Sequence, residues 1–295
     1  MPPSTHPLHA PVLAWYAENS RDLPWRRADV TPWGVLVSEV MLQQTPVSRV
    51  LPVWLSWMAR WPEPASLAAA GPGAAVRMWD RLGYPRRALR LHAAASNITT
   101  QHGGRVPADV DVLLTLPGVG AYTAAAVASF AFGQRHAVLD TNVRRLHARA
   151  VTGTAHAAVT VTAGERELAE QLLPEDESAA AQWAVAAMEL GALVCRARAP
   201  RCADCPVRDL CAWQLSGRPA HRGPARRTQS WTGTDRQVRG RLMAVLREAP
   251  GAVPAERLAA CWDDAVQRGR CLDSLVGDGL VEQLRDGLFR LPGEQ

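Results

Sequence analysis

Four of the six cysteines stand close together in one short segment of the chain. The segment reads Cys195-x6-Cys202-x2-Cys205-x5-Cys211. Four thiolates at such a spacing can hold either one [4Fe–4S] cluster or one zinc ion. Zinc sites usually pair two CxxC motifs, whereas this segment has a single CxxC and unequal outer gaps, so the spacing favours the iron–sulfur cluster. The two distant cysteines, Cys261 and Cys271, are expected to be core thiols.

A glycine-rich turn, LPGVG at residues 116–120, precedes a stretch of small and apolar residues at 121–132. Gly118 and Gly120 allow a tight turn whose backbone N–H groups point outward. The positive end of the following helix dipole adds to these groups, so the turn could bind a DNA phosphate regardless of base sequence. The same turn could instead be a simple packing corner between two helices.

Two carboxylates could carry acid–base chemistry. Asp140 lies in VLDTNVRR, directly before a predicted helix, where an aspartate can also serve as an N-cap. Glu39 lies among apolar residues in VLVSEVML and is either on a solvated face or partly desolvated. Desolvation would raise its pKa and make it a usable general acid. Gln43 and Gln44 follow at the expected helix end, where their amides could contact base edges in a minor groove.

Helices must position these residues, because helical patterns separated by Gly and Pro breaks cover the chain to about residue 213. Helices are expected at 32–47, 50–60, 74–82, 89–102, 110–116, 121–132, 142–151, 165–173 and 179–193. Residues 216–234 are rich in Gly, Pro, Ser, Thr and Arg and resemble a linker. Beyond it, helices at 236–248, 256–262 and 264–276 precede two apolar runs around Asp286-Gly287, which predict a hairpin and hence a small winged-helix module.

Composition restricts the function further. The 295-residue chain has a formal net charge of +5, which is compatible with a nucleic-acid partner. All 33 of its Lys and Arg residues are arginine, so no lysine can form a Schiff base with an opened sugar. No secretory signal or membrane-spanning stretch is recognisable, so we expect a cytoplasmic protein with no membrane partner.

The motifs, taken in order, resemble the adenine DNA glycosylases of the helix–hairpin–helix superfamily, the MutY type, over about residues 8–213. They are LPWR (23–26), SEVMLQQT (38–45), LGY (82–84), LPGVGAYTA (116–124), LDTNV (139–143), MELGALVC (188–195) and the four-cysteine segment. The resemblance implies an all-α, two-lobed fold with the active site between the lobes. A helical barrel would span 30–135, residues 1–29 and 136–215 would form the cluster lobe, and 235–295 would be the winged-helix-like module.

The resemblance also implies an activity, the excision of adenine mispaired with 8-oxoguanine or guanine in base excision repair. The enzyme would flip the adenine out of double-stranded DNA and act without cutting the strand. Glu39 would protonate the adenine and help to activate water, and Asp140 would stabilise the sugar cation or bond to it transiently. Supporting roles fall to Tyr122 and Asn142 at the catalytic site, Trp25 and Arg26 in the adenine pocket, and Gln43, Gln44 and Tyr84 around the lesion. A [4Fe–4S] cluster on the four cysteines would be structural or would position DNA, and a monomer is expected.

Rival functions remain. An endonuclease III-type enzyme shares the hairpin, the aspartate and the cluster, but its catalytic lysine would fall where this chain has Tyr122. Thymine or uracil mismatch glycosylases are compatible with Tyr122. A non-catalytic iron–sulfur DNA-binding protein is the alternative outside the enzymes.

The chain also departs from the family pattern. Pro85 replaces a second tyrosine, Thr141 replaces a glycine, and residues 235–295 are too short for the Nudix-like domain that reads 8-oxoguanine in many members.

Overall fold

The computed structural model describes residues 6–220 and 231–294 and divides the chain into two compact units. The first unit takes its described residues from 1–35, 108–114 and 119–225, and the second from 36–107, 115–118 and 226–295. Part of the linker expected at 216–234 lies outside the described residues. Within the described ranges no helix is long and apolar enough to cross a membrane.

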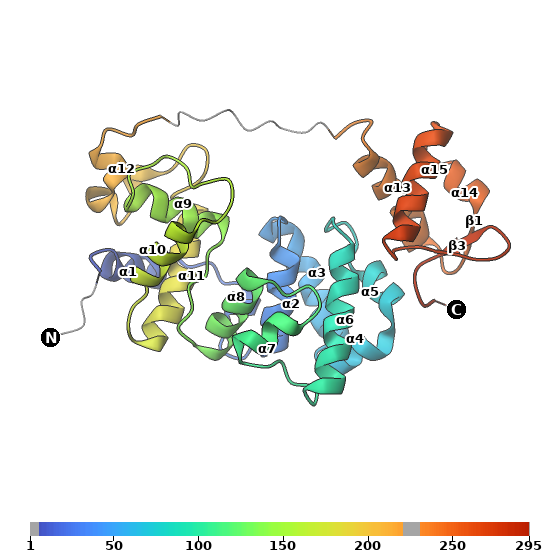
Figure 1. Ribbon diagram of the computed structural model, residues 1–295, viewed down its shortest axis with the longest axis horizontal. Helices are drawn as coiled ribbons and strands as arrows, with labels where there is room; N and C mark the ends of the chain where they lie inside the picture. Colours follow the sequence, from blue (N-terminus) through green and yellow to red (C-terminus); the bar gives the residue numbers. More distant parts are fainter. Residues whose placement is uncertain (1–5, 221–230, 295) are drawn as a thin grey trace. The chain divides into compact units, whose positions relative to one another are not determined.

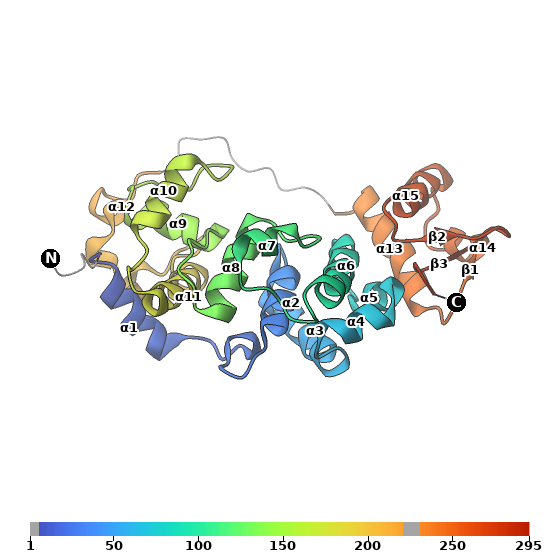
Figure 2. The ribbon, with the colours of Figure 1, turned by 60° about the horizontal axis from the view of Figure 1, so that its bottom comes forward.

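The first unit is built around α11 (Glu177–Leu193), which packs against α1 (His9–Asn19), α8 (Ala121–Phe132) and α9 (Thr141–Ala150) (Figures 1 and 2). Its core gathers apolar side chains of α1, α9 and α11, Trp183 among them. The other elements of this unit are the 3-10 turns Pro24–Arg26, Cys202–Asp204 and Arg208–Leu210, and the helices α10 (Ala163–Gln171) and α12 (Ala212–Leu215). The loops between α11 and α12 carry the cysteine segment.

The helices of the second unit surround a tryptophan-rich core. Trp57 of α3 meets Trp61 and Trp79 edge to face, with ring centroids 4.9 and 5.7 Å apart. Its indole N–H donates to the carbonyl of Met78 at 3.0 Å. The helices are α3 (Val47–Arg60), α4 (Pro64–Ala70), α5 (Pro72–Met78) and α6 (Arg86–Gln101), and two more, α2 (Pro32–Leu42) and α7 (Val110–Thr115), have residues in both units.

The C-terminal part of the second unit contains the three predicted helices and the predicted hairpin. Helices α13 (Asp235–Glu248), α14 (Ala255–Ala259) and α15 (Ala265–Gly277) pack with a small antiparallel sheet of order β1-β3-β2 (Figure 2). The strands are β1 (Val253–Pro254), β2 (Glu282–Gln283) and β3 (Leu288–Arg290). The predicted hairpin is the β2–β3 pair, in register Glu282 with Arg290. Cys271 is buried as predicted, and Cys261 is half-buried.

This module docks on α5 through a set of specific contacts. Arg77 forms a bidentate pair with Glu294, with both oxygens 2.8 Å from Nη2, and also donates to the carbonyl of Ala249 at 2.8 Å. Arg247 of α13 donates back to the carbonyl of Val76 at 3.1 Å. A Cβ on Gly73 would lie 2.6 Å from a backbone oxygen of the module, so only glycine allows this close approach.

Several helix ends differ from the sequence-based expectation. The helix expected at 32–47 ends at Leu42, because Gln44 adopts a left-handed φ of 56° and Pro46 caps the next helix. Three helices, α1, α4 and α12, were not predicted individually, and α4 and α12 are too short for a clear helical period.

Candidate active site

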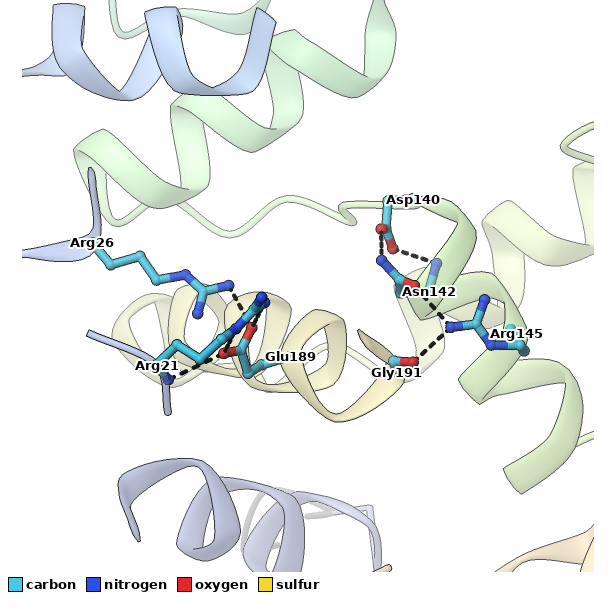
Figure 3. Close-up of polar contacts among 7 residues, drawn as sticks. All are labelled: Arg21, Arg26, Asp140, Asn142, Arg145, Glu189 and Gly191. Carbon is cyan, nitrogen blue, oxygen red and sulfur yellow. Dashed lines mark hydrogen bonds and ion pairs between the residues drawn. The ribbon is translucent and has the colours of Figure 1, made fainter. Parts of the chain in front are cut away.

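Asp140 is the N-cap of α9, as its position in the sequence allowed. Its Oδ1 accepts hydrogen bonds from the backbone N–H groups of Asn142 and Val143 at 2.8 and 2.7 Å. Its Oδ2 accepts one from the side-chain amide of Asn142 at 2.6 Å (Figure 3). Burial raises the pKa of Asp140, and these three hydrogen bonds oppose the rise without cancelling it. The carboxylate is therefore held rigidly in a site that disfavours its charge, which suits a group that must meet a developing cation.

Hydrogen bonds connect Asp140 to the cysteine segment through Asn142 and Arg145, and Figure 3 shows them as far as the carbonyl of Gly191. Asn142 accepts at Oδ1 from Arg145 at 2.8 Å. Arg145 also donates to the carbonyls of Gly191 and Cys195, each at 2.6 Å. A Cβ on Gly191 would lie 2.6 Å from the backbone oxygen of Asn142, so the close crossing of α9 and α11 requires glycine here. The geometry of the aspartate thus depends on the backbone that holds the first cysteine.

The four clustered cysteines line one pocket, together with Arg149, Val207 and Trp213. Burial and the neighbouring thiols raise the pKa of Cys205 to about 11, and burial also raises the pKa of Cys195. Thiolates at this site therefore need a cation to compensate them, which fits a metal cluster. Among the described residues, no group of three or more His, Cys, Asp or Glu side chains is placed so that it could hold a metal ion.

A buried ion-pair network fixes the segment before α2, and the sequence did not single out its centre. Glu189 of α11 is fully buried and accepts from Arg21 at 2.6 Å and from Arg26 at 3.0 Å (Figure 3). Burial alone would raise the pKa of Glu189, but the hydrogen bonds and charges of the two arginines lower it to about 2. The motif MELGALVC contained this glutamate, yet only its burial marks it as important. Arg26 is thereby held in one position, next to the buried Trp25.

Tyr122 lies in the first turn of α8 and is half-buried. It packs on a small core of Ala126, Val138 and Ala184. Tyr122 therefore shares with Asp140 the first unit, where Val138 lies two residues before the aspartate.

Glu39 lies in the part of α2 that belongs to the second unit, with 5% of its surface exposed. Of the two possibilities left by the sequence, a solvated face and a desolvated one, the structure favours the desolvated one.

The segment after α2 is organised by the buried side chain of Arg87. Its Nη1 donates to the carbonyls of Val40, Met41 and Gln43 at 2.8, 3.0 and 2.6 Å, which satisfies the free carbonyls at the helix end. Its Nη2 donates to the backbone carbonyl of Gly83, the residue before Tyr84, at 3.0 Å. Burial lowers the pKa of Arg87 to about 10, so it remains charged at neutral pH.

Arg87 thus joins two loops that carry predicted DNA contacts. Gln44 and Tyr84 are both exposed, and both have left-handed backbone conformations, with φ of 56° and 46°.

The predicted hairpin turn lies between α7 and α8. Gly118 has a φ of 83°, and a Cβ there would lie 2.7 Å from Arg90, so this position requires glycine. Gly120 has an ordinary extended backbone and open space around it, so its missing side chain leaves the start of α8 accessible. Both features suit backbone contact with a phosphate.

Comparison with known proteins identifies the family. The profile of the HhH-GPD superfamily of base excision DNA repair proteins matches residues 37–170. The chain is 52% identical over 297 residues to the adenine DNA glycosylase of Mycobacterium tuberculosis strain H37Rv, covering 99% of this chain and 97% of that one. It is 41% identical to the human adenine DNA glycosylase over 68% of this chain and 38% of the human one.

Two solved structures are similar to this chain. A thermostable thymine-DNA glycosylase superposes with a TM-score of 0.63 at 28% identity, covering 70% of this chain and 94% of that one. An endonuclease III–DNA covalent intermediate has the same fold, with a TM-score of 0.59 at 22% identity over 70% of this chain and 93% of the other. The predicted helical glycosylase fold is thereby confirmed. Together with the ordered motifs and near full-length similarity, these matches show that the chain belongs to the adenine DNA glycosylase family of the HhH-GPD superfamily.

Proposed function

We propose that this enzyme removes adenine mispaired with 8-oxoguanine or guanine from double-stranded DNA and leaves the strand intact. The observation that carries the proposal is Asp140, a rigidly hydrogen-bonded carboxylate with a raised pKa, in a chain whose relatives are adenine DNA glycosylases. A purine leaves DNA through an oxocarbenium-like sugar, and such a cation needs a fixed anion beside it.

In this mechanism the bond between the adenine and the sugar breaks, and its electron pair goes to the adenine. Glu39 gives a proton to an adenine ring nitrogen, which makes the base a better leaving group. Asp140 stabilises the positive charge that develops on the sugar, and Asn142 holds Asp140 in place. Water adds to the sugar carbon and returns a proton to Glu39. Tyr122 supports this site, while Trp25 and Arg26 line the adenine pocket.

The absence of lysine supports the monofunctional assignment. Strand cleavage by the lyase route needs an amine that forms a Schiff base with the opened sugar. The chain has no lysine at all, and Tyr122 stands at the position where the endonuclease III type would have one.

A thymine-mismatch activity is the second candidate, because 70% of this chain is 31% identical to a thymine-DNA glycosylase of Aeropyrum pernix. The desolvated Glu39 favours the adenine reaction, since protonating adenine requires a general acid.

The four cysteines that line this pocket, from Cys195 to Cys211, are proposed to hold a [4Fe–4S] cluster. When bound, the cluster would fix the loop between α11 and α12 and would take no part in base removal. Iron and acid-labile sulfide should be present in equal amounts, about four of each per chain. Zinc without sulfide would contradict the assignment.

A base-release assay tests the substrate assignment. Duplexes containing A:8-oxoguanine, A:G, T:G and thymine glycol should be compared, with free base and strand breaks scored separately. We expect adenine release from the first two and no strand cleavage. We propose that residues 235–295, three helices with a small sheet, act as a winged-helix module in place of a Nudix-like domain, so excision from A:G should be well retained relative to A:8-oxoguanine. Thymine release from T:G with no adenine release would support the second candidate, and no base release at all would support a DNA-binding protein. We further propose that the enzyme acts as a monomer in the cytoplasm.

A further inference from the structure

The winged-helix module brings an arginine onto the exposed tyrosine of the helical part of the same unit. The guanidinium of Arg236, in the first turn of α13, lies 5.1 Å from the ring centroid of Tyr84. The same guanidinium lies 5.4 Å from the ring centroid of Trp231. Both aromatic side chains are about half exposed, at 47% for Tyr84 and 52% for Trp231. The two exposed rings and the cation they share form an aromatic surface patch of the kind that marks a binding site.

Arg236 differs from the other arginines around it in what it binds. Arg270 pairs with Asp235 at 2.7 Å, and Arg239 pairs with Asp278 at 2.5 Å. Over residues 6–220 and 231–294, Arg236 contacts aromatic rings and forms neither a hydrogen bond nor an ion pair. Within the described residues its N–H donors therefore have no acceptor, while Asp235 and Asp278 of the same module each pair with another arginine.

The placement of Arg236 over Tyr84 is fixed from both sides. Tyr84 has a left-handed backbone and also lies 5.7 Å from the buried guanidinium of Arg87. On the side of the module, Asp278 also accepts from Arg86 of α6 at 3.2 Å. The pairing of Arg77 with Glu294 and the tight crossing at Gly73 secure the module further. These contacts hold the aromatic pair and its arginine as one preformed surface.

We propose that Trp231 and Arg236 extend the DNA-contacting surface already expected at Tyr84, with Arg236 binding a backbone phosphate and Trp231 stacking on a base exposed at the mismatch. An arginine with open donors is a strong phosphate ligand, and exposed aromatic rings stack on bases of any identity. The module would then strengthen binding of the duplex beside the lesion without recognising 8-oxoguanine. The inference rests on the proposed function for its substrate, but its test is separate.

The test measures binding of a fluorescently labelled duplex, carrying a non-cleavable adenine analogue opposite guanine, across a series of salt concentrations. A lost phosphate contact reduces the slope of log K against log salt by about 0.9. We expect this reduction for Arg236→Ala, together with weaker binding. The matched control is Arg257→Ala, which removes an equal charge from an exposed position on α14 of the same module. The control should keep the slope of the unmodified protein.

A second variant separates DNA contact from a purely structural role. Arg236→Lys keeps the charge, so most of the slope of log K against log salt should remain. If Arg236 only packed against the rings, Arg236→Lys and Arg236→Ala would weaken DNA binding equally. Equal slopes for Arg236→Ala and Arg257→Ala, with both proteins folded by circular dichroism, would overturn the inference. So would a Lys variant that behaves like the Ala variant. If the unmodified enzyme releases no adenine, the proposed function fails, while the slope comparison still decides the role of Arg236.

Discussion

The side-chain amide of Asn142 donates to Oδ2 of Asp140 at 2.6 Å, two residues away on the first turn of α9. With the two backbone N–H groups on Oδ1, it fixes both oxygens of the carboxylate. The same aspartate is therefore a helix cap and the candidate cation-stabilising group, so the two roles must be separated by experiment.

Asp140→Asn separates them. Asparagine is as good an N-cap as aspartate, so the cap remains. Because burial raises the pKa of Asp140, the folded state holds the carboxyl proton more tightly than the unfolded state does. Ionisation therefore costs stability as the pH rises through the folded pKa, and asparagine removes that cost. We expect an equal or higher free energy of unfolding at neutral pH, and adenine excision reduced about 100-fold or more.

Asp140→Ala is the comparison for this experiment. It should also lose about 1 kcal/mol of stability with the cap. Urea unfolding and single-turnover excision measured on both variants check the prediction, and an active Asn variant would contradict a catalytic role.

Arg145→Met removes the donor to Asn142 and to the carbonyls of Gly191 and Cys195. The aspartate then loses the support of Asn142, and the backbone at the first cysteine is released. We expect a lower excision rate at saturating enzyme, little change in duplex affinity, and faster loss of iron. The matched control is Arg166→Met, at an exposed position on α10 of the same unit. A variant that loses affinity but keeps its rate would show that Arg145 binds DNA instead.

Glu189→Gln leaves Arg21 and Arg26 without their carboxylate partner. Breaking a buried pair is strongly destabilising, and the partial exposure of both arginines reduces the effect to about 2 to 3 kcal/mol. Since Arg26 then moves freely, adenine excision should weaken mainly through KM. Chemical denaturation and steady-state kinetics check both effects, with Glu175→Gln, an exposed change before α11, as the control. Unchanged stability would contradict the role of the network.

His147→Phe should flatten the acid side of the stability profile. Burial lowers the pKa of His147 to about 4, and its ring stacks on Trp183 at 6.4 Å. As the pH falls below 6.5 the unfolded state takes up the proton first, so the free energy of unfolding decreases toward pH 4. This contribution amounts to up to about 3 kcal/mol over the window.

Phenylalanine keeps the stacking and does not titrate. The free energy of unfolding of His147→Phe should therefore rise relative to that of the unmodified protein as the pH falls. Denaturation at pH 7.5 and pH 5 measures it, with His102→Phe as the control. A constant difference at both pH values would contradict the assignment.

The sequence predicted the parts of the site that depend on local pattern. The cysteine spacing, the turn at Gly118 and the position of Asp140 before α9 are local, and the structure has each in place. Residues that act through distant partners could not be found this way. Glu189 meets arginines more than 160 positions earlier, and Arg236 reaches Tyr84 only because the module docks on α5. Neither contact leaves a periodic signal in the sequence.

The most direct test of base removal by Glu39 and Asp140 is the release of free adenine from an A:8-oxoguanine duplex under single-turnover conditions. Strand breaks are scored before and after alkali on the same samples. The unmodified enzyme should release adenine and break the strand only after alkali, while Glu39→Gln and Asp140→Asn should bind the duplex and release almost none. Strand cleavage without alkali, or full adenine release by either variant, would contradict the account.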